Sequence, residues 1–202
     1  MCIRDSPCDH EVRLTGLSIG QQLTLFLRSK DLALNAFESA DLQVTTIDLP
    51  DVAITEVLAA SGRDPDNSGE YIELFNFGQE PISIGGWQVQ RIGSTSRIDI
   101  PEDTILAAGE YVLLVGNGFV VGSFAGVTES NVLRTTSSKL FSFGLSNSDL
   151  TVALVDDQGR SLSATPRLVS TTGMSKARER LDAEVFCNAT PTPLAWTAND
   201  CQ

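Results

Sequence analysis

The chain of 202 residues contains a single histidine, His10, close to the N-terminus. Ser/His/Asp and Cys/His catalytic groups need a histidine beside other reactive side chains, and so do many metal sites. The sequence therefore excludes most hydrolase mechanisms, and we expect no enzymatic activity in this chain.

Positive charge is also scarce, because 14 Lys and Arg residues face 26 Asp and Glu residues and give a formal net charge of −12. Such a surface repels phosphate backbones, so nucleic acid is not an expected partner. The longest apolar run, 111–115, is far shorter than the roughly 18 residues of a membrane helix. We therefore expect no membrane span.

The first six residues, MCIRDS, look like the translation of a transposase end sequence used in sequencing libraries. We interpret residues 1–6 as a sequencing scar and leave them out of the fold. On this interpretation we expect the natural N-terminus to lie elsewhere, and the sequence is silent about a signal peptide.

Alternation of apolar and polar residues is the main structural signal. Short alternating runs at 22–27, 71–75 and 152–155 are separated by Gly, Asn, Asp, Ser and Pro, and they indicate strands. Many such strands predict an all-β sandwich. The best helical candidate spans 175–184, although few apolar residues recur there at helical spacing.

The chain divides near Pro50, and the first unit has a recognisable order of elements. These are a strand at 11–14, a Gly-Leu-x-x-Gly corner at 16–20, a strand at 22–27, an Asp-x-x-x-Asn turn at 31–35 and a strand at 42–46. The order resembles the C-terminal half of a fibronectin type III domain, although Ile19 and Leu23 replace the usual proline and tyrosine of the corner. The resemblance implies an incomplete β-sheet at residues 7–48, which cannot bury both of its faces.

The second unit carries the most specific pattern. Its motifs are ITEV at 54–57, EYIELFN at 70–76, IGGW at 84–87, IDIP at 98–101 and LAAGEYVL at 106–113. They resemble the lamin tail domain, an immunoglobulin-like β-sandwich of nuclear lamins and of many secreted or surface proteins of bacteria. The resemblance implies such a sandwich at 49–168 and a C-terminal extension at 169–202. Without visible coiled-coil heptads, we expect the bacterial secreted or surface type.

The motif residues have structural interpretations that need no ligand. We expect Trp87 to pack in the core, Gly85 and Gly86 to allow close backbone approach, and Gly109 to form a turn with positive φ. We expect Glu73 to form a surface ion pair with an arginine such as Arg91. The full set of motif residues is Glu70, Tyr71, Glu73, Asn76, Gly86, Trp87 and Gly109.

The acidic loop at 61–69 is the candidate metal site. It follows the first positions of an EF-hand loop, but Phe75 stands where the bidentate glutamate is needed, which excludes an EF-hand. A looser calcium site formed by Asp64, Asp66 and Glu70 stays open beside the alternative of a solvated turn. No other cofactor is expected.

The cysteines bear on the cellular location of the protein. A disulfide between Cys187 and Cys201 would close a short loop and stabilise the tail by about 3 kcal/mol in the chain-entropy model. We expect this bridge, with free thiols or mates elsewhere as the alternatives, and Cys8 is then left without a partner. The bridge predicts an extracellular or cell-surface location.

One basic cluster and three loops are candidate contact surfaces. The cluster comprises Arg160, Arg167, Lys176, Arg178 and Arg180. It either docks a phosphate or acidic partner or neutralises nearby carboxylates, and without interleaved exposed aromatics we expect no nucleic-acid groove. The loops are 62–69, 93–97 and 116–127, and the last is either a covered edge or an exposed apolar patch.

These features predict a non-catalytic binding or spacer module of a larger secreted or cell-surface protein, with a protein or a surface polysaccharide as partner. One alternative is an accessory domain of a secreted nuclease or phosphatase whose catalytic unit lies outside these residues. Another is a calcium-dependent adhesion module, which predicts a calcium-dependent rise in thermal stability that Asp64→Ala removes.

Overall fold

The computed structural model describes residues 14, 21–31, 35–63, 68–182 and 184–196, in a chain that divides into two compact units, Met1–Leu49 and Pro50–Gln202. The described part of the first unit holds two antiparallel pairs. These are β1 (Gln22–Leu25) with β4 (Leu42–Thr45), and β2 (Arg28–Lys30) with β3 (Ala36–Glu38). Large apolar side chains of these pairs and their connections are exposed, namely Phe26, Leu27, Phe37, Leu42 and Ile47.

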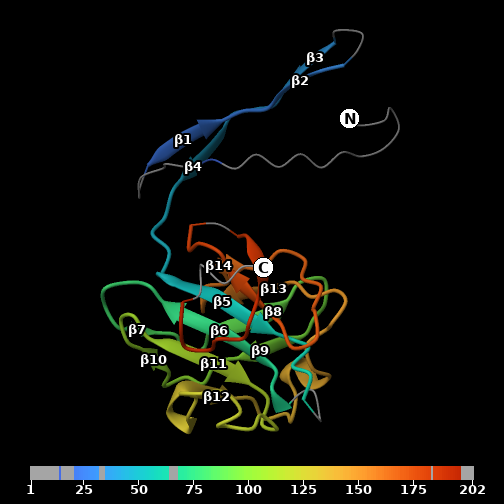
Figure 1. The fold of residues 1–202 in the computed structure, drawn as a ribbon. Helices are drawn as coiled ribbons and strands as arrows, with labels where there is room; N and C mark the ends of the chain where they lie inside the picture. The colour runs from blue at the N-terminus through green and yellow to red at the C-terminus, as the bar shows by residue number, and fades with distance from the viewer. Residues whose placement is uncertain (1–13, 15–20, 32–34, 64–67, 183, 197–202) are drawn as a thin grey trace. The chain divides into compact units, whose positions relative to one another are not determined.

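The second unit contains two main sheets (Figure 1). The six-stranded sheet has the order β12 (Val132–Arg134), β11 (Tyr111–Val115), β6 (Tyr71–Asn76), β5 (Val52–Leu58), β15 (Ser175–Arg178) and β16 (Phe186–Ala189). The four-stranded sheet has the order β14 (Ser161–Ala164), β13 (Val152–Val155), β8 (Gln88–Arg91) and β9 (Arg97–Asp99). The described residues of this unit also form a small pair, β7 (Ile82–Ser83) with β10 (Ile105–Leu106), and the short 3-10 helices η2 (Glu129–Asn131) and η3 (Leu140–Ser142).

One hydrophobic core joins the two sheets. Alternate residues of β5, β6 and β11 point toward β8, β9 and β13, because successive side chains of a strand face opposite sides. Trp87 lies in this core immediately before β8. The core side chains from the six-stranded sheet include Ile54, Val57, Ile72, Leu74, Val112 and Leu114, and those from the other sheet include Val89, Ile98, Val152 and Leu154.

The outer face of the six-stranded sheet is covered as well. A second apolar cluster there combines Leu58, Tyr71, Leu113 and Val115 of the sheet with Phe119 and Val127 of the following loop. Phe124 of the same loop lies edge-on to Tyr71, with 5.6 Å between the ring centroids. The loop 116–127 is therefore a cover over the sheet, with Val120 as an exposed exception.

The all-β class and the immunoglobulin-like sandwich predicted from the sequence are confirmed. The helical expectation at 175–184 is wrong, because 175–178 form β15. In that strand Ser175 and Ala177 share the outer face, whereas Arg178 reaches inward to the Ile54 carbonyl. Within the segment expected to be an extension, β15 and β16 join the same sheet as β5 and so belong to the sandwich.

Candidate functional site

The motif residues of the second unit mainly hold turns and loops in place through hydrogen bonds and turn geometry. Asn76 ends β6, and its side-chain amide donates to the carbonyls of Glu80, Leu106 and Ala107 at 2.9 to 3.0 Å. Gly109, in the turn before β11, has φ of 72°. Glu70 is buried, and its carboxylate accepts a 3.2 Å hydrogen bond from the backbone N–H of Leu145. These contacts hold turns and loops against the sheet edges.

Glu73 does not lie where the sequence analysis placed it. The expected surface ion pair with Arg91 is wrong, because Glu73 is buried on the outer face of β6 and Arg91 belongs to the four-stranded sheet. One Glu73 oxygen accepts from the Thr55 hydroxyl at 2.6 Å, and the other accepts from the Leu194 N–H at 2.6 Å. The C-terminal segment around Leu194 therefore closes over this carboxylate.

A second buried glutamate, Glu56, lies directly opposite Glu73 in the register of β5 and β6. Its Oε1 atom accepts from the Ser175 hydroxyl and from the Thr192 N–H, the latter at 3.2 Å. Burial raises the pKa of Glu56, against the lowering effect of its hydrogen-bond partners. Burial and then the charge of Glu56 raise the pKa of Glu73 to about 8. The sandwich thus contains two facing carboxyl groups that are costly to ionise together.

The free energy of unfolding should fall as the pH rises from about 4.5 to about 8 in a buffer free of divalent cations. In this range folded Glu73 keeps a proton that the unfolded chain has released, so each rise in pH favours unfolding. Glu73→Gln removes this titration and should flatten the profile. Urea unfolding followed by tryptophan fluorescence at several pH values measures both proteins, and identical pH profiles would contradict the assignment.

The family of the second unit follows from its strand order and from these motifs. The lamin tail domain family matches residues 45–166 of the chain, which is more than half of its length. The chain belongs to this family. No curated protein matches it.

The calcium site predicted for this lamin tail domain lies partly outside the described residues, because Asp64 and Asp66 are not among them. Within the described part of the chain, no group of three or more His, Cys, Asp or Glu side chains is arranged to hold a metal. The site formed by Asp64, Asp66 and Glu70 therefore stays a prediction.

The cysteine pairing predicted for the tail also reaches beyond the described residues. Cys187 lies on β16 and is disulfide-bonded. Cys201 lies outside the described residues, so its pairing with Cys187 stays a prediction.

The basic cluster of the lamin tail domain is largely neutralised. Arg160 pairs with Asp156 at 2.6 Å, Arg167 with Asp149 at 3.0 Å, and Arg180 with Asp182 at 2.7 Å. Arg178 is buried and donates to the carbonyl of Ile54, while Lys176 donates to the side chain of Asn188. Of the alternatives left open for this cluster, neutralisation fits the geometry.

None of the helices in the described part of the chain is long and apolar enough to cross a membrane.

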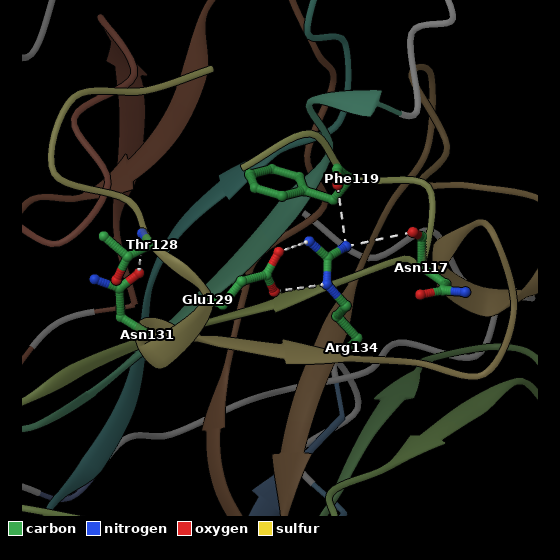
Figure 2. Close-up of polar contacts among 6 residues, drawn as sticks. All are labelled: Asn117, Phe119, Thr128, Glu129, Asn131 and Arg134. Atoms are coloured by element: carbon green, nitrogen blue, oxygen red, sulfur yellow. Dashed lines mark hydrogen bonds and ion pairs between the residues drawn. The ribbon is translucent and has the colours of Figure 1, made fainter. Parts of the chain in front are cut away.

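Arg134 fixes the loop 116–127 to the sheet edge (Figure 2). Its guanidinium pairs with both Glu129 oxygens and donates to the carbonyls of Asn117 and Phe119. Hydrogen bonds from Arg134 lower the pKa of Glu129. The Asn131 side chain accepts from the backbone N–H of Thr128 and so closes the start of η2. These hydrogen bonds hold the loop in place over the outer face of the sheet.

An exposed aromatic side chain beside a cavity is a candidate contact surface that the sequence analysis did not include. Phe143 is 90% exposed, and it follows Phe141 and Ser142, whose φ angles are 48° and 66°. A cavity of about 430 Å³ lies beside this Phe143 loop, residues 140–144. Its lining includes Arg97, Glu102, Arg134, Ser137, Lys139 and Phe141. No sequence signal pointed to this surface, since one phenylalanine in a turn matches no motif.

Proposed function

We propose that this lamin tail domain is a non-catalytic interaction module of a larger secreted or cell-surface protein, and that it binds a protein partner through the Phe143 loop. The observation that supports this proposal is the backbone conformation of the loop, in which Phe141 and Ser142 have positive φ angles. Positive φ at a bulky residue costs on the order of 1–3 kcal/mol and persists only where the surroundings enforce it. Here Phe141 is buried in the core between the sheets, and Phe143 is exposed.

The surroundings of Phe143 support a protein partner. Aromatic and arginine side chains are enriched at protein interfaces, and a few such anchors carry most of the binding energy. Lys139 is exposed beside the loop, and the cavity offers both acidic and basic groups together with the hydroxyl of Ser137. The disulfide at Cys187 supports an extracellular or cell-surface location, because such bonds persist in oxidising compartments.

Peptide display on the full chain tests this proposal. Random peptides are selected on the immobilised protein, and their affinity is then measured for the wild type, Phe143→Ser and Val120→Ser. We expect Phe143→Ser to weaken binding about 30-fold, which corresponds to the loss of one anchor of about 2 kcal/mol. Val120→Ser, at a residue that is 53% exposed in another loop, should leave binding unchanged.

Peptides that bind the wild type and Phe143→Ser equally would contradict the proposed surface. A glycan array probed with the same three proteins separates the other partner class. Binding confined to glycans would replace the protein partner by a polysaccharide.

A further inference from the structure

Three buried oxygen atoms of the described residues have no hydrogen-bond partner, and all three gather at one place. They are Glu56 Oε2, the Tyr71 hydroxyl and Thr192 Oγ1. In folded proteins the large majority of buried polar side-chain atoms are paired, so each exception calls for an explanation. A common explanation is needed here, because Tyr71 and Thr192 both lie beside the Glu56 carboxylate.

The convergence on Glu56 follows from the sheet register. Glu56 faces Glu73 across β5 and β6, and Tyr71 lies two residues before Glu73 on the same face of β6. Burial raises the pKa of Glu56, and hydrogen bonding from Ser175 and from the Tyr71 hydroxyl lowers it, so the Tyr71 hydroxyl lies beside this carboxylate, although no well-formed hydrogen bond joins the two groups. Thr192 completes the group, because its N–H donates to Glu56 Oε1 at 3.2 Å.

No positive charge compensates the two carboxylates within the part of the chain that the structure describes. Neither Glu56 nor Glu73 takes part in an ion pair there. The nearest basic residues along β15 are engaged elsewhere: Arg178 donates to the Ile54 carbonyl, and Lys176 donates to Asn188. Buried carboxylates are costly unless a cation or a proton neutralises them.

We propose that Glu56, Glu73, Tyr71 and Thr192 form a binding site for an oxygen-ligated metal cation of the calcium class. The available ligands are carboxylate and hydroxyl oxygens, which calcium prefers, and the site offers no sulfur or imidazole. Each Glu73 oxygen accepts one hydrogen bond and keeps a second lone pair for a metal. The site is distinct from the loop of Asp64 and Asp66, and it does not depend on the Phe143 surface.

A bound cation explains both the unpartnered oxygens and the pair of buried carboxyl groups, whereas an ordered water molecule explains only the oxygens. A water molecule can pair with the three unpartnered oxygens, but it leaves the two facing carboxyl groups to be neutralised by protons alone, as at Glu73 below about pH 8. A divalent cation satisfies the oxygens and neutralises both carboxylates. The C-terminal segment then acts as a cover, since the N–H groups of Thr192 and Leu194 hold the same two carboxylates.

Terbium(III) luminescence of the full chain tests the site, because this ion is a calcium substitute whose emission is sensitised by nearby tyrosine rings. We expect saturable emission, with one ion per chain, that excess calcium displaces. Glu56→Gln should abolish the saturable signal, and Thr192→Val should weaken terbium affinity about tenfold. Asp103→Asn, at an exposed carboxylate, and the double variant Asp64→Asn/Asp66→Asn should retain it.

Several outcomes would overturn the proposal. These are no saturable emission from the wild type, emission retained in Glu56→Gln, or emission lost in Asp64→Asn/Asp66→Asn. Circular dichroism reports whether each variant folds. If Glu56→Gln does not fold, Thr192→Val decides the question, because it removes only a hydroxyl group, and unchanged terbium affinity in that variant would contradict the site.

Discussion

Gly85→Ala is expected to destabilise the sandwich by about 3 kcal/mol or more, at the upper end of the cost of overpacking. A Cβ atom on Gly85 would overlap the carbonyl group of Glu102 and lie 2.9 Å from its Cα. Because these are backbone atoms, the chain leading into β8 must move, and Trp87 with it. Urea unfolding of the full chain, followed by tryptophan fluorescence, measures the loss.

Gly93→Ala is the matched control for this prediction. Gly93 has φ of 79°, and no atom lies within 4 Å of a Cβ built there. The control therefore carries only the cost of a strained backbone, about 1 kcal/mol. Equal destabilisation by the two variants would contradict the prediction, because it would show that close packing against Glu102 is not the reason for the glycine at position 85.

Arg178→Met is expected to cost about 3 kcal/mol, because it breaks a buried network of charged hydrogen bonds. From β15 the guanidinium donates to the Ile54 carbonyl of β5 at 2.7 Å, and to the Ser163 hydroxyl and Ala164 carbonyl of β14 at 2.8 and 3.1 Å. It thereby ties the two sheets together. It also lies over the Phe186 ring at 4.9 Å from the centroid.

The effect of Arg178→Met is measured as the shift in the urea midpoint and compared with Arg180→Met. Arg180 forms an exposed pair with Asp182, and such surface pairs contribute little. We expect a much smaller shift for Arg180→Met than for Arg178→Met. A similarly small shift for Arg178→Met would contradict its role as a tie between the sheets.

The fold was predictable from the sequence because its signals are local. Alternation at 71–75 and 152–155 sets the inward and outward faces of each strand, and the spaced motifs identify the family. The segment 175–184 shows the limit of this reasoning. Its charged residues suggested a solvated helix, whereas pairing with β5 and β16 makes 175–178 a strand.

The buried carboxylates were not predictable, because their burial depends on contacts between distant parts of the chain. Glu73 alternates with Ile72 and Leu74, as the solvent-facing side of a strand does, and Glu56 follows the polar residue Thr55. Their outer face is nevertheless covered by the loop 116–127 and by the segment around Leu194, more than a hundred residues after β6. Alternation specifies which residues share a face, but not whether another segment covers it.

The two sheets of the second unit share one core. We therefore expect them to unfold together. Native-state hydrogen exchange of the full chain, followed amide by amide, tests it most directly. We predict that the amides of β5 and β6 and those of β8 and β13 exchange with the same free energy of opening, equal to that of global unfolding. Exchange of β8 and β13 at a much lower free energy than β5 and β6 would show that the sheets are independent, and would contradict the account.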